Sequence, residues 1–122
     1  MPDSRFPVTL AGGIPVVGAP EEIDVTNTDG LKAAMLEAAR VHQVMVIDMS
    51  QTRFCDSAGM HALLSARKRA RDQDGELMLV LTGAAVLRVF AITGADRLIP
   101  NFATMNEALA YAADVIAESA AR

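Results

Sequence analysis

Two adjoining stretches decide the fold of this chain: Val44-Met45-Val46-Ile47-Asp48 and Cys55-Asp56-Ser57-Ala58-Gly59. The first is a short, continuous apolar run, which is typical of a central strand that is covered on both faces. Residues 57–72 follow, with alanine and leucine recurring at the spacing of one helix face. We therefore expect a buried strand that leads into a helix, with Ser57 exposed near the helix N-terminus. Such a terminus favours anions, so this serine is a natural place for a phosphate.

The N-terminal part of the chain predicts a β-hairpin. Residues 6–11 and 14–17 are short and β-like, and the Gly12-Gly13 pair between them is a hairpin turn signal. Proline cannot donate a hydrogen bond to a strand ladder. Pro15 and Pro20 therefore confine the second strand to a sheet edge, or they lie at its ends.

The remaining segments alternate between helix and strand patterns. Apolar residues at helical spacing follow Asn27 or Thr28, and a second continuous apolar run, residues 77–81, predicts another central strand. Three further elements complete the order: a helix closed by Gly94, a short strand at Leu98-Ile99 stopped by Pro100, and a last helix opened by the capping box Thr104-Met105-Asn106-Glu107.

This order, β-β-α-β-α-β-α-β-α, predicts a single α/β domain over residues 1–122. We expect a mixed, mostly parallel sheet with right-handed crossovers, an N-terminal β-hairpin and about four helices. In such sheets functional residues collect at the C-terminal ends of the strands, which is where the segment after Ile47 lies.

Composition and charge restrict the functions open to this chain. With 122 residues, 52% of them hydrophobic and 21% charged, it can bury the core of one globular domain. The formal net charge of -4 argues against a nucleic-acid or anionic-membrane surface, because both need clustered cations. No apolar run reaches the ~20 residues of a membrane span, and prolines and glycines interrupt residues 6–19. We expect no signal peptide and a cytoplasmic location.

We expect no enzyme activity, cofactor or metal site. A serine nucleophile needs a nearby base, but no histidine follows His61, and Cys55 stands where a nucleophile elbow has its first glycine. The chain lacks a glycine-rich phosphate motif, and one cysteine with two histidines offers too few ligands for zinc. Asp48 and Asp56 could share a metal, but a strand end and a helix cap are the favoured interpretations.

Several residues around Ser57 have an ordinary structural interpretation. Cys55 is expected in the core rather than as a reactive thiol. Asp56 or Ser57 can cap the helix, a role worth about 1 kcal/mol. We expect His61 and Met60 at the surface beside the serine. The cations further along the helix suit the C-terminal end of its dipole and are expected to be solvated; they are Arg67, Lys68, Arg69 and Arg71.

Four segments of the sequence together resemble one known family. They are Glu22-Ile23-Asp24, the strand Val44-Met45-Val46-Ile47-Asp48, the tetrad Asp56-Ser57-Ala58-Gly59, and Gly94-Ala95-Asp96-Arg97-Leu98-Ile99-Pro100. The ordered set resembles the STAS-domain family and is most similar to the stand-alone anti-sigma factor antagonists of bacteria. The resemblance covers about residues 6–113. The tetrad alone is weakly specific, whereas the ordered set of four is fairly specific.

The resemblance implies a switch without catalysis of its own. In that family the serine after the aspartate accepts a phosphate, which corresponds to Ser57 here. The kinase is the anti-sigma factor, a partner with an ATP-binding fold. The unphosphorylated antagonist binds this partner and frees the sigma factor, and a phosphatase reverses the modification. The partner-binding residues expected on this basis are Asp24, Asp56, Ser57, Ala58, Gly59, Met60 and His61.

An alternative stays open, because STAS-like domains also serve as non-phosphorylated modules of transport complexes or as small-molecule sensors. For such a module the serine hydroxyl would be expendable. Three positions depart from the family pattern: Glu21 stands where glycine is common, Ala58 replaces a serine or threonine, and Ala95 replaces a leucine. The alanine at 58 leaves Ser57 as the one hydroxyl of the tetrad. The strands near Pro15 indicate a monomer or a weak dimer.

Overall fold

The computed structural model describes residues 5–121. Within this range the chain forms seven strands and five helices. In chain order they are β1 Val8–Ala11, β2 Ile14–Gly18, β3 Glu22–Ile23, α1 Thr28–Val41, β4 Val44–Met49, β5 Phe54–Cys55, α2 Ser57–Asp72, β6 Glu76–Leu81, α3 Ala84–Thr93, α4 Ala95–Leu98, β7 Asn101–Phe102 and α5 Met105–Ala120. No helix in this range is both long enough and apolar enough to cross a membrane.

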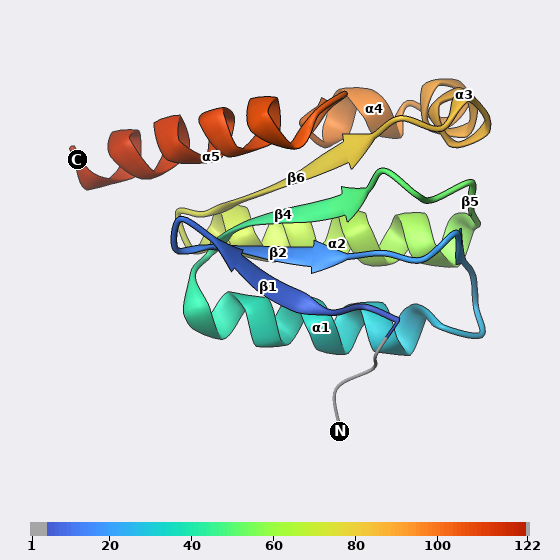
Figure 1. Ribbon diagram of the computed structural model, residues 1–122, viewed down its shortest axis with the longest axis horizontal. Helices are drawn as coiled ribbons and strands as arrows, with labels where there is room; N and C mark the ends of the chain where they lie inside the picture. The colour runs from blue at the N-terminus through green and yellow to red at the C-terminus, as the bar shows by residue number, and fades with distance from the viewer. Residues whose placement is uncertain (1–4, 122) are drawn as a thin grey trace.

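The main sheet has the strand order β1-β2-β4-β6-β7. β1 and β2 form the predicted antiparallel hairpin, and all other neighbours in this sheet are parallel. β3 and β5 form a separate two-stranded parallel sheet beyond the C-terminal ends of the central strands (Figure 1). The predicted α/β class, the hairpin and the mostly parallel sheet are therefore confirmed. The small second sheet was not predicted, because strands of two residues carry no detectable alternation of apolar and polar side chains.

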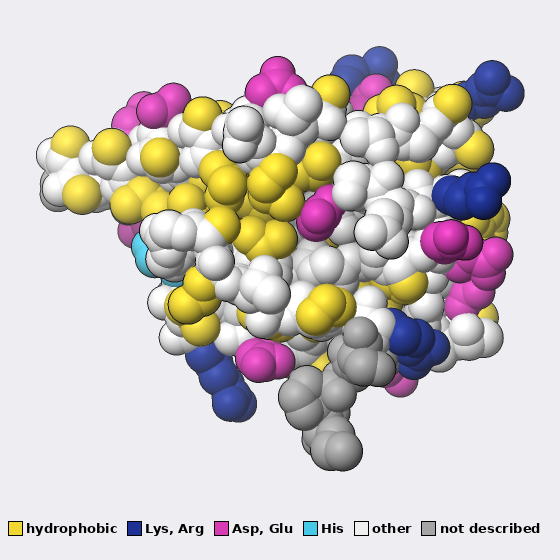
Figure 2. Space-filling view, viewed as in Figure 1, with side chains coloured by type: hydrophobic (Ala, Val, Ile, Leu, Met, Phe, Trp, Pro, Cys, Tyr) yellow, Lys and Arg dark blue, Asp and Glu magenta, His cyan; other side chains and the backbone are white. Residues whose placement is uncertain are grey.

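The central strands are covered on both faces. Val44 and Val46 of β4 pack in the apolar cluster that contains α5, whereas Met45, Ile47 and Met49 pack in the cluster that contains α1 and α2. All six residues of β6 are buried. Figure 1 shows α1 and α2 on one side of the sheet and α5 on the other, and Figure 2 shows hydrophobic side chains gathered along α5. This two-sided burial is the reason for the continuous apolar runs in the sequence.

The sequence allowed two arrangements: β2 at a sheet edge, or the prolines near the ends of β2. The second is correct, because β2 lies inside the sheet between β1 and β4. Pro15 pairs with Leu10 of β1, and the parallel pairing of β2 with β4 begins only at Val16. Pro20 lies two residues after Gly18, the last residue of β2. The N–H group that each proline lacks is therefore not required by the ladder between β2 and β4.

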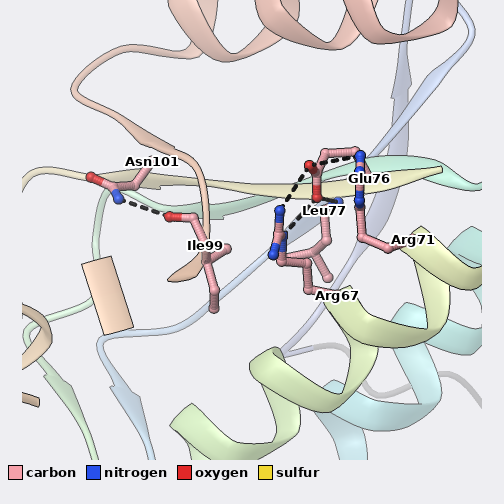
Figure 3. A network of polar contacts seen from close by, with 6 residues as sticks. All are labelled: Arg67, Arg71, Glu76, Leu77, Ile99 and Asn101. Carbon is pink, nitrogen blue, oxygen red and sulfur yellow. Dashed lines mark hydrogen bonds and ion pairs between the residues drawn. The ribbon is translucent and has the colours of Figure 1, made fainter. Parts of the chain in front are cut away.

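The predicted strand at Leu98-Ile99 is wrong. Gly94, with a φ of 81°, ends α3 and is followed directly by the single turn of α4. Strand pairing begins after this turn, where the Pro100 carbonyl accepts a hydrogen bond of 2.9 Å from the Leu79 N–H. The Asn101 side chain also donates to the Ile99 carbonyl at 2.9 Å (Figure 3). Leu98 is thus the last residue of α4 and Ile99 its C-cap, a context that these two side chains alone do not reveal.

A buried carboxylate joins α2 to the start of β6. Glu76 is only 1% exposed, and its Oε1 accepts hydrogen bonds of 2.9 Å from Arg67 Nε and from the Leu77 N–H. Its Oε2 accepts a bond of 3.2 Å from Arg67 Nη2 and lies 3.6 Å from Arg71 Nη1 (Figure 3). The charge is therefore compensated from two successive turns of one helix.

This ion pair corrects the expectation that the cations near the end of α2 are all solvated. Arg67 and Arg71 bind the buried Glu76, and Lys68 lies 3.7 Å from Asp72 one turn further on. Lys68 and Arg69 fit the expectation: the Lys68 side chain is 81% exposed, and Arg69 is exposed and forms no ion pair within residues 5–121. A sequence cluster of four cations therefore has three different environments.

Replacing Arg67 by alanine should destabilise the fold by about 3 kcal/mol, because the buried Glu76 would keep only the more distant Arg71 as a cationic partner. Urea unfolding of both proteins measures this difference. Arg69→Ala is the matched control, and its effect should stay within about 0.5 kcal/mol. Equal effects of the two substitutions would contradict a structural role for the ion pair.

Candidate functional site: a serine at a capped helix start

The short parallel pair of β3 and β5 brings two distant aspartates to one edge of the molecule. Ile23 at the end of β3 is paired with Cys55 at the end of β5, and the Asp56 N–H donates to the Ile23 carbonyl at 3.0 Å. Asp24 and Asp56 follow these paired residues directly. The structure thus places Asp24 at the same edge as the Asp56-Ser57-Ala58-Gly59 tetrad, as the sequence comparison led us to expect.

Asp56 is the N-cap of α2 and also links this helix to the loop before α1. Its Oδ1 accepts a hydrogen bond of 2.9 Å from the Gly59 N–H, which satisfies one donor of the first helical turn. Its Oδ2 accepts a bond of 3.1 Å from the Val25 N–H. The capping interpretation is therefore correct for Asp56, and one carboxylate holds two segments that lie 31 residues apart in the sequence.

Ser57 is the first residue of α2 and is exposed. Its hydroxyl has no hydrogen-bond partner among residues 5–121, so the capping role left open for it belongs to Asp56 alone. The first backbone hydrogen bond of the helix runs from the Met60 N–H to the Asp56 carbonyl at 3.0 Å. The N–H groups of Ser57 and Ala58 come before this bond, in the part of a helix that attracts anions.

Gly59 is required by close packing between α2 and the small sheet. A Cβ atom at this position would lie 2.6 Å from Ile23 Cγ2 and 2.9 Å from Cys55 Sγ. Both contacts are shorter than carbon and sulfur atoms tolerate, so a larger residue would push the helix start away from β3 and β5. The glycine of the tetrad therefore sets the distance between Ser57 and the rest of this edge.

Cys55 lies below this surface and is not a reactive thiol. It is 3% exposed, and its burial, with a smaller effect of the Asp56 charge, raises its pKa to about 12. A thiol with such a pKa stays protonated at neutral pH and is a poor nucleophile. The expectation that Cys55 is a core residue is therefore confirmed.

Asp24 stabilises its own loop by accepting hydrogen bonds. Its Oδ1 accepts from the Thr26 N–H at 2.9 Å and from the Thr26 hydroxyl, and these bonds lower the pKa of the Asp24 carboxyl. Its N–H donates to Asn27 Oδ1 at 3.0 Å. The Asn27 side chain therefore stabilises the loop rather than capping α1. Asp24 is ionised at neutral pH. Its hydrogen bonds hold the loop in which the Val25 N–H donates to the Asp56 carboxylate.

The comparison with known proteins identifies the family. Residues 5–108 match the family model described as the STAS domain. This chain belongs to the STAS-domain family. The solved structure of an anti-sigma factor antagonist from Mycobacterium paratuberculosis is 28% identical, with a TM-score of 0.79 over 88% of this chain and 92% of that chain.

Two more distant structures show the same fold. The Bacillus cell fate determinant SpoIIAA, solved in its phosphorylated form, is 18% identical with a TM-score of 0.65 over 87% of this chain and 97% of that chain. The murine anion transporter Slc26a9 is 18% identical with a TM-score of 0.68, over 84% of this chain and 18% of that chain. The STAS fold therefore occurs both as a stand-alone protein and as a small part of a transporter.

The structure corrects one expectation about the surface of this STAS domain. Met60 was expected to be exposed beside Ser57, but it is 8% exposed, and the Thr93 hydroxyl donates to its sulfur at 3.3 Å. The fourth residue of α2 points toward α3, whereas His61, one turn after Ser57, is exposed as expected. Met60 thus supports the site from below and connects it to α3.

Two exposed apolar residues beside the tetrad were not recognised from the sequence. Val25 is 73% exposed and Phe54 is 49% exposed. The Val25 backbone is held by the Asp56 carboxylate, and Phe54 belongs to β5. In the sequence each looks like an ordinary apolar residue of a strand or loop. Phe54 is three residues from Ser57 in the sequence, but only the pairing of β3 with β5 shows that Val25 lies at the same edge.

The different roles of Asp56 and Ser57 predict different effects on stability. Asp56→Ala removes two hydrogen bonds and should destabilise the domain by about 1–2 kcal/mol. Ser57→Ala removes a hydroxyl that none of residues 5–121 binds and should change stability by less than about 0.5 kcal/mol. Urea unfolding of both variants tests this prediction. A loss as large for the serine variant as for the aspartate variant would mean that Ser57 also holds the helix start.

The raised pKa of Cys55 predicts slow thiol labelling. At pH 8 the folded protein should react with a disulfide reagent at least about 100-fold more slowly than the protein unfolded in guanidinium, because the folded state holds so little thiolate. Unfolding releases a thiol with a pKa near 9.0, so stability should also fall as the pH rises above that value. Rapid labelling of the folded protein would show that the thiol is accessible and ionised.

Proposed function

We propose that this STAS domain is an anti-sigma factor antagonist whose binding to an anti-sigma factor kinase is switched by phosphorylation of Ser57. One observation carries the proposal: an exposed hydroxyl, bound by none of residues 5–121, stands at a helix start that Asp56 already caps. The similarity to an anti-sigma factor antagonist and to a protein solved in a phosphorylated form supports it.

The domain itself should accept a phosphate on Ser57 without refolding. The helix dipole and the free N–H groups at the start of α2 favour an anion at this place. No hydrogen bond from the Ser57 hydroxyl to any of residues 5–121 has to break. Phosphorylation would therefore leave the fold intact and change only the surface that a partner meets.

The partner is affected differently, because the site is already acidic. Asp24 and Asp56 lie at this edge, with Glu21 and Glu22 exposed just before them. A phosphate would add about -1.5 to -2 charges there. A partner that packs against unphosphorylated Ser57 would, after phosphorylation, cover an unpaired charge at the same contact. Burying such a charge costs several kcal/mol. Since each 1.4 kcal/mol is tenfold in affinity, a loss of about 100-fold is expected.

The contact surface has a polar centre and apolar margins. Ser57 and His61 are exposed, and Ala58 is half-buried between them. We assign Val25 and Phe54 as apolar anchors, since exposed valine and phenylalanine side chains gain free energy when a partner covers them. Asp56, Gly59 and Met60 belong to the same site but act by holding the helix start in place.

In this proposal the domain performs no catalysis. The kinase supplies ATP, a serine phosphatase reverses the modification, and the proteins meet in the cytoplasm. The partner's release of a sigma factor then regulates transcription without any direct contact between this domain and nucleic acid. The alternative is a STAS module of a transport or sensor complex, for which the fold of Slc26a9 is a precedent.

Incubation with a cognate anti-sigma factor kinase and ATP should place one phosphate on Ser57, which mass spectrometry locates. Ser57→Ala should gain none. Ser57→Asp should weaken the complex measured by calorimetry, in the direction of the ~100-fold loss expected for the phosphate, while its thermal unfolding stays nearly unchanged.

Ser50→Asp is the matched control for added charge. Ser50 is also exposed, follows β4 at the same edge of the main sheet, and uses only its backbone in hydrogen bonds. Its substitution should change affinity far less than Ser57→Asp. Phosphate at another residue, or unchanged binding by Ser57→Asp, would contradict the proposed switch. A partner complex whose affinity does not change with any substitution of Ser57 would favour the transport or sensor module.

A further inference from the structure

A groove with cationic walls runs between α1 and α2 and begins one helical turn from Ser57. Its volume is about 300 Å³. Met35 of α1 and Ala62 of α2 are buried in it, and Leu36 is 51% exposed beside them. The polar residues that line it are Lys32, His61, Ser65 and Arg69. It is therefore an apolar surface with basic and neutral polar margins.

The charge of this groove is opposite to that of the molecule as a whole. The chain carries a net charge of -4, and the edge around Ser57 is acidic, yet no aspartate or glutamate lines the groove. Lys32 and Arg69 are exposed and form no ion pair within residues 5–121. Within the described part of the chain, two cations on opposite helices thus have no ion-pair partner and lie on either side of an apolar floor.

The groove is continuous with the proposed phosphorylation site. Ser57, His61, Ser65 and Arg69 follow one another at intervals of four residues along α2, and all four are exposed. Residues four apart lie on the same helix face. Three of them line the groove, and the first is the proposed phosphate acceptor. A partner that reaches the Ser57 hydroxyl is therefore one turn away from the groove.

We propose that this groove holds an acidic amphipathic helix of the kinase that phosphorylates Ser57. From His61 to Arg69 the groove follows eight residues of α2, or ~12 Å, which matches about two turns of a third helix. Such a helix would place an apolar side chain over Ala62 and Met35, and carboxylates beside Lys32 and Arg69. Charge complementarity selects an acidic segment over a basic one.

This docking site rests on the proposed function but has a separate role. Ser57 carries the charge that switches the complex, whereas the groove adds affinity at a place that a phosphate on Ser57 does not cover. Arg69 lies twelve residues from Ser57, or ~18 Å along the helix, beyond the ~8–10 Å over which salt screens exposed charges. The far end of the groove should therefore attract the partner in both phosphorylation states.

The test is the pair of substitutions Lys32→Glu and Arg69→Glu in the full-length protein, with binding to the purified cognate kinase measured by calorimetry. Turning two attractions into repulsions should weaken binding about tenfold or more. Mass spectrometry should still find the phosphate on Ser57 at saturating kinase. Both side chains are exposed, so thermal unfolding should not change.

Arg88→Glu with Arg97→Glu is the matched control, because it makes the same charge change at exposed positions of α3 and α4. It should leave affinity within about twofold. Unchanged binding of the groove variant, or an equal loss in the control, would overturn the groove proposal while leaving the Ser57 switch intact. Lack of any complex with the kinase would overturn both. If the groove variant instead lost only binding to phosphatidylglycerol vesicles, the groove would belong to a lipid and the proposal would also be wrong.

Discussion

Burial of β4 and β6 on both faces is the constraint on which the rest of this structure depends. Strands this apolar are stable only between two layers of helices, and parallel strands need a crossover helix between them. Both demands are met by α1 and α2 on one face and α5 on the other. Because the central strands run parallel, their C-terminal ends meet at one edge. The small β3–β5 sheet and the start of α2 extend that edge, which gives the functional residues a rigid base.

At this edge the Asp56 carboxylate stabilises the helix start, while the Ser57 hydroxyl is bound by none of the described residues. Asp56 caps α2 and binds the Val25 backbone, so it joins the two loops from which the site is built. Gly59 lets α2 approach the small sheet, and the buried Cys55 fills the space below. Ser57 therefore stands on a well-supported helix start without contributing to it. Such an arrangement allows a covalent change of charge at the surface with little effect on the fold.

Charge is distributed unevenly over the molecule, and burial decides how each charge acts. Glu76 is buried and strongly paired, so its arginines serve stability. The Asp24 carboxylate accepts hydrogen bonds within its own loop. Lys32 and Arg69 have no such partner within residues 5–121 and border an apolar groove. An acidic edge for the switch and a cationic groove beside it give a protein partner two chemically different surfaces within reach of one helix.

The fold class, the two central strands and the helix that begins at Ser57 were predictable from the amino-acid sequence, because long apolar runs and helical spacing are local signals of burial. The sequence also predicted that Asp56 could cap a helix and that Cys55 is a core residue. The three-dimensional structure was needed to show which of Asp56 and Ser57 is the cap, that Met60 is buried against Thr93, and that Arg67 and Arg71 bind Glu76. It alone revealed β3, β5 and α4, and the place of Val25 and Phe54 beside the tetrad. The burial of Met60 against Thr93 and the place of Val25 beside the tetrad arise from contacts between segments more than 30 residues apart, and such partners leave no periodic trace in the sequence. The helix cap and the ion pairs of Glu76 join residues close in sequence, but the choice among several polar side chains depends on how these are placed in space.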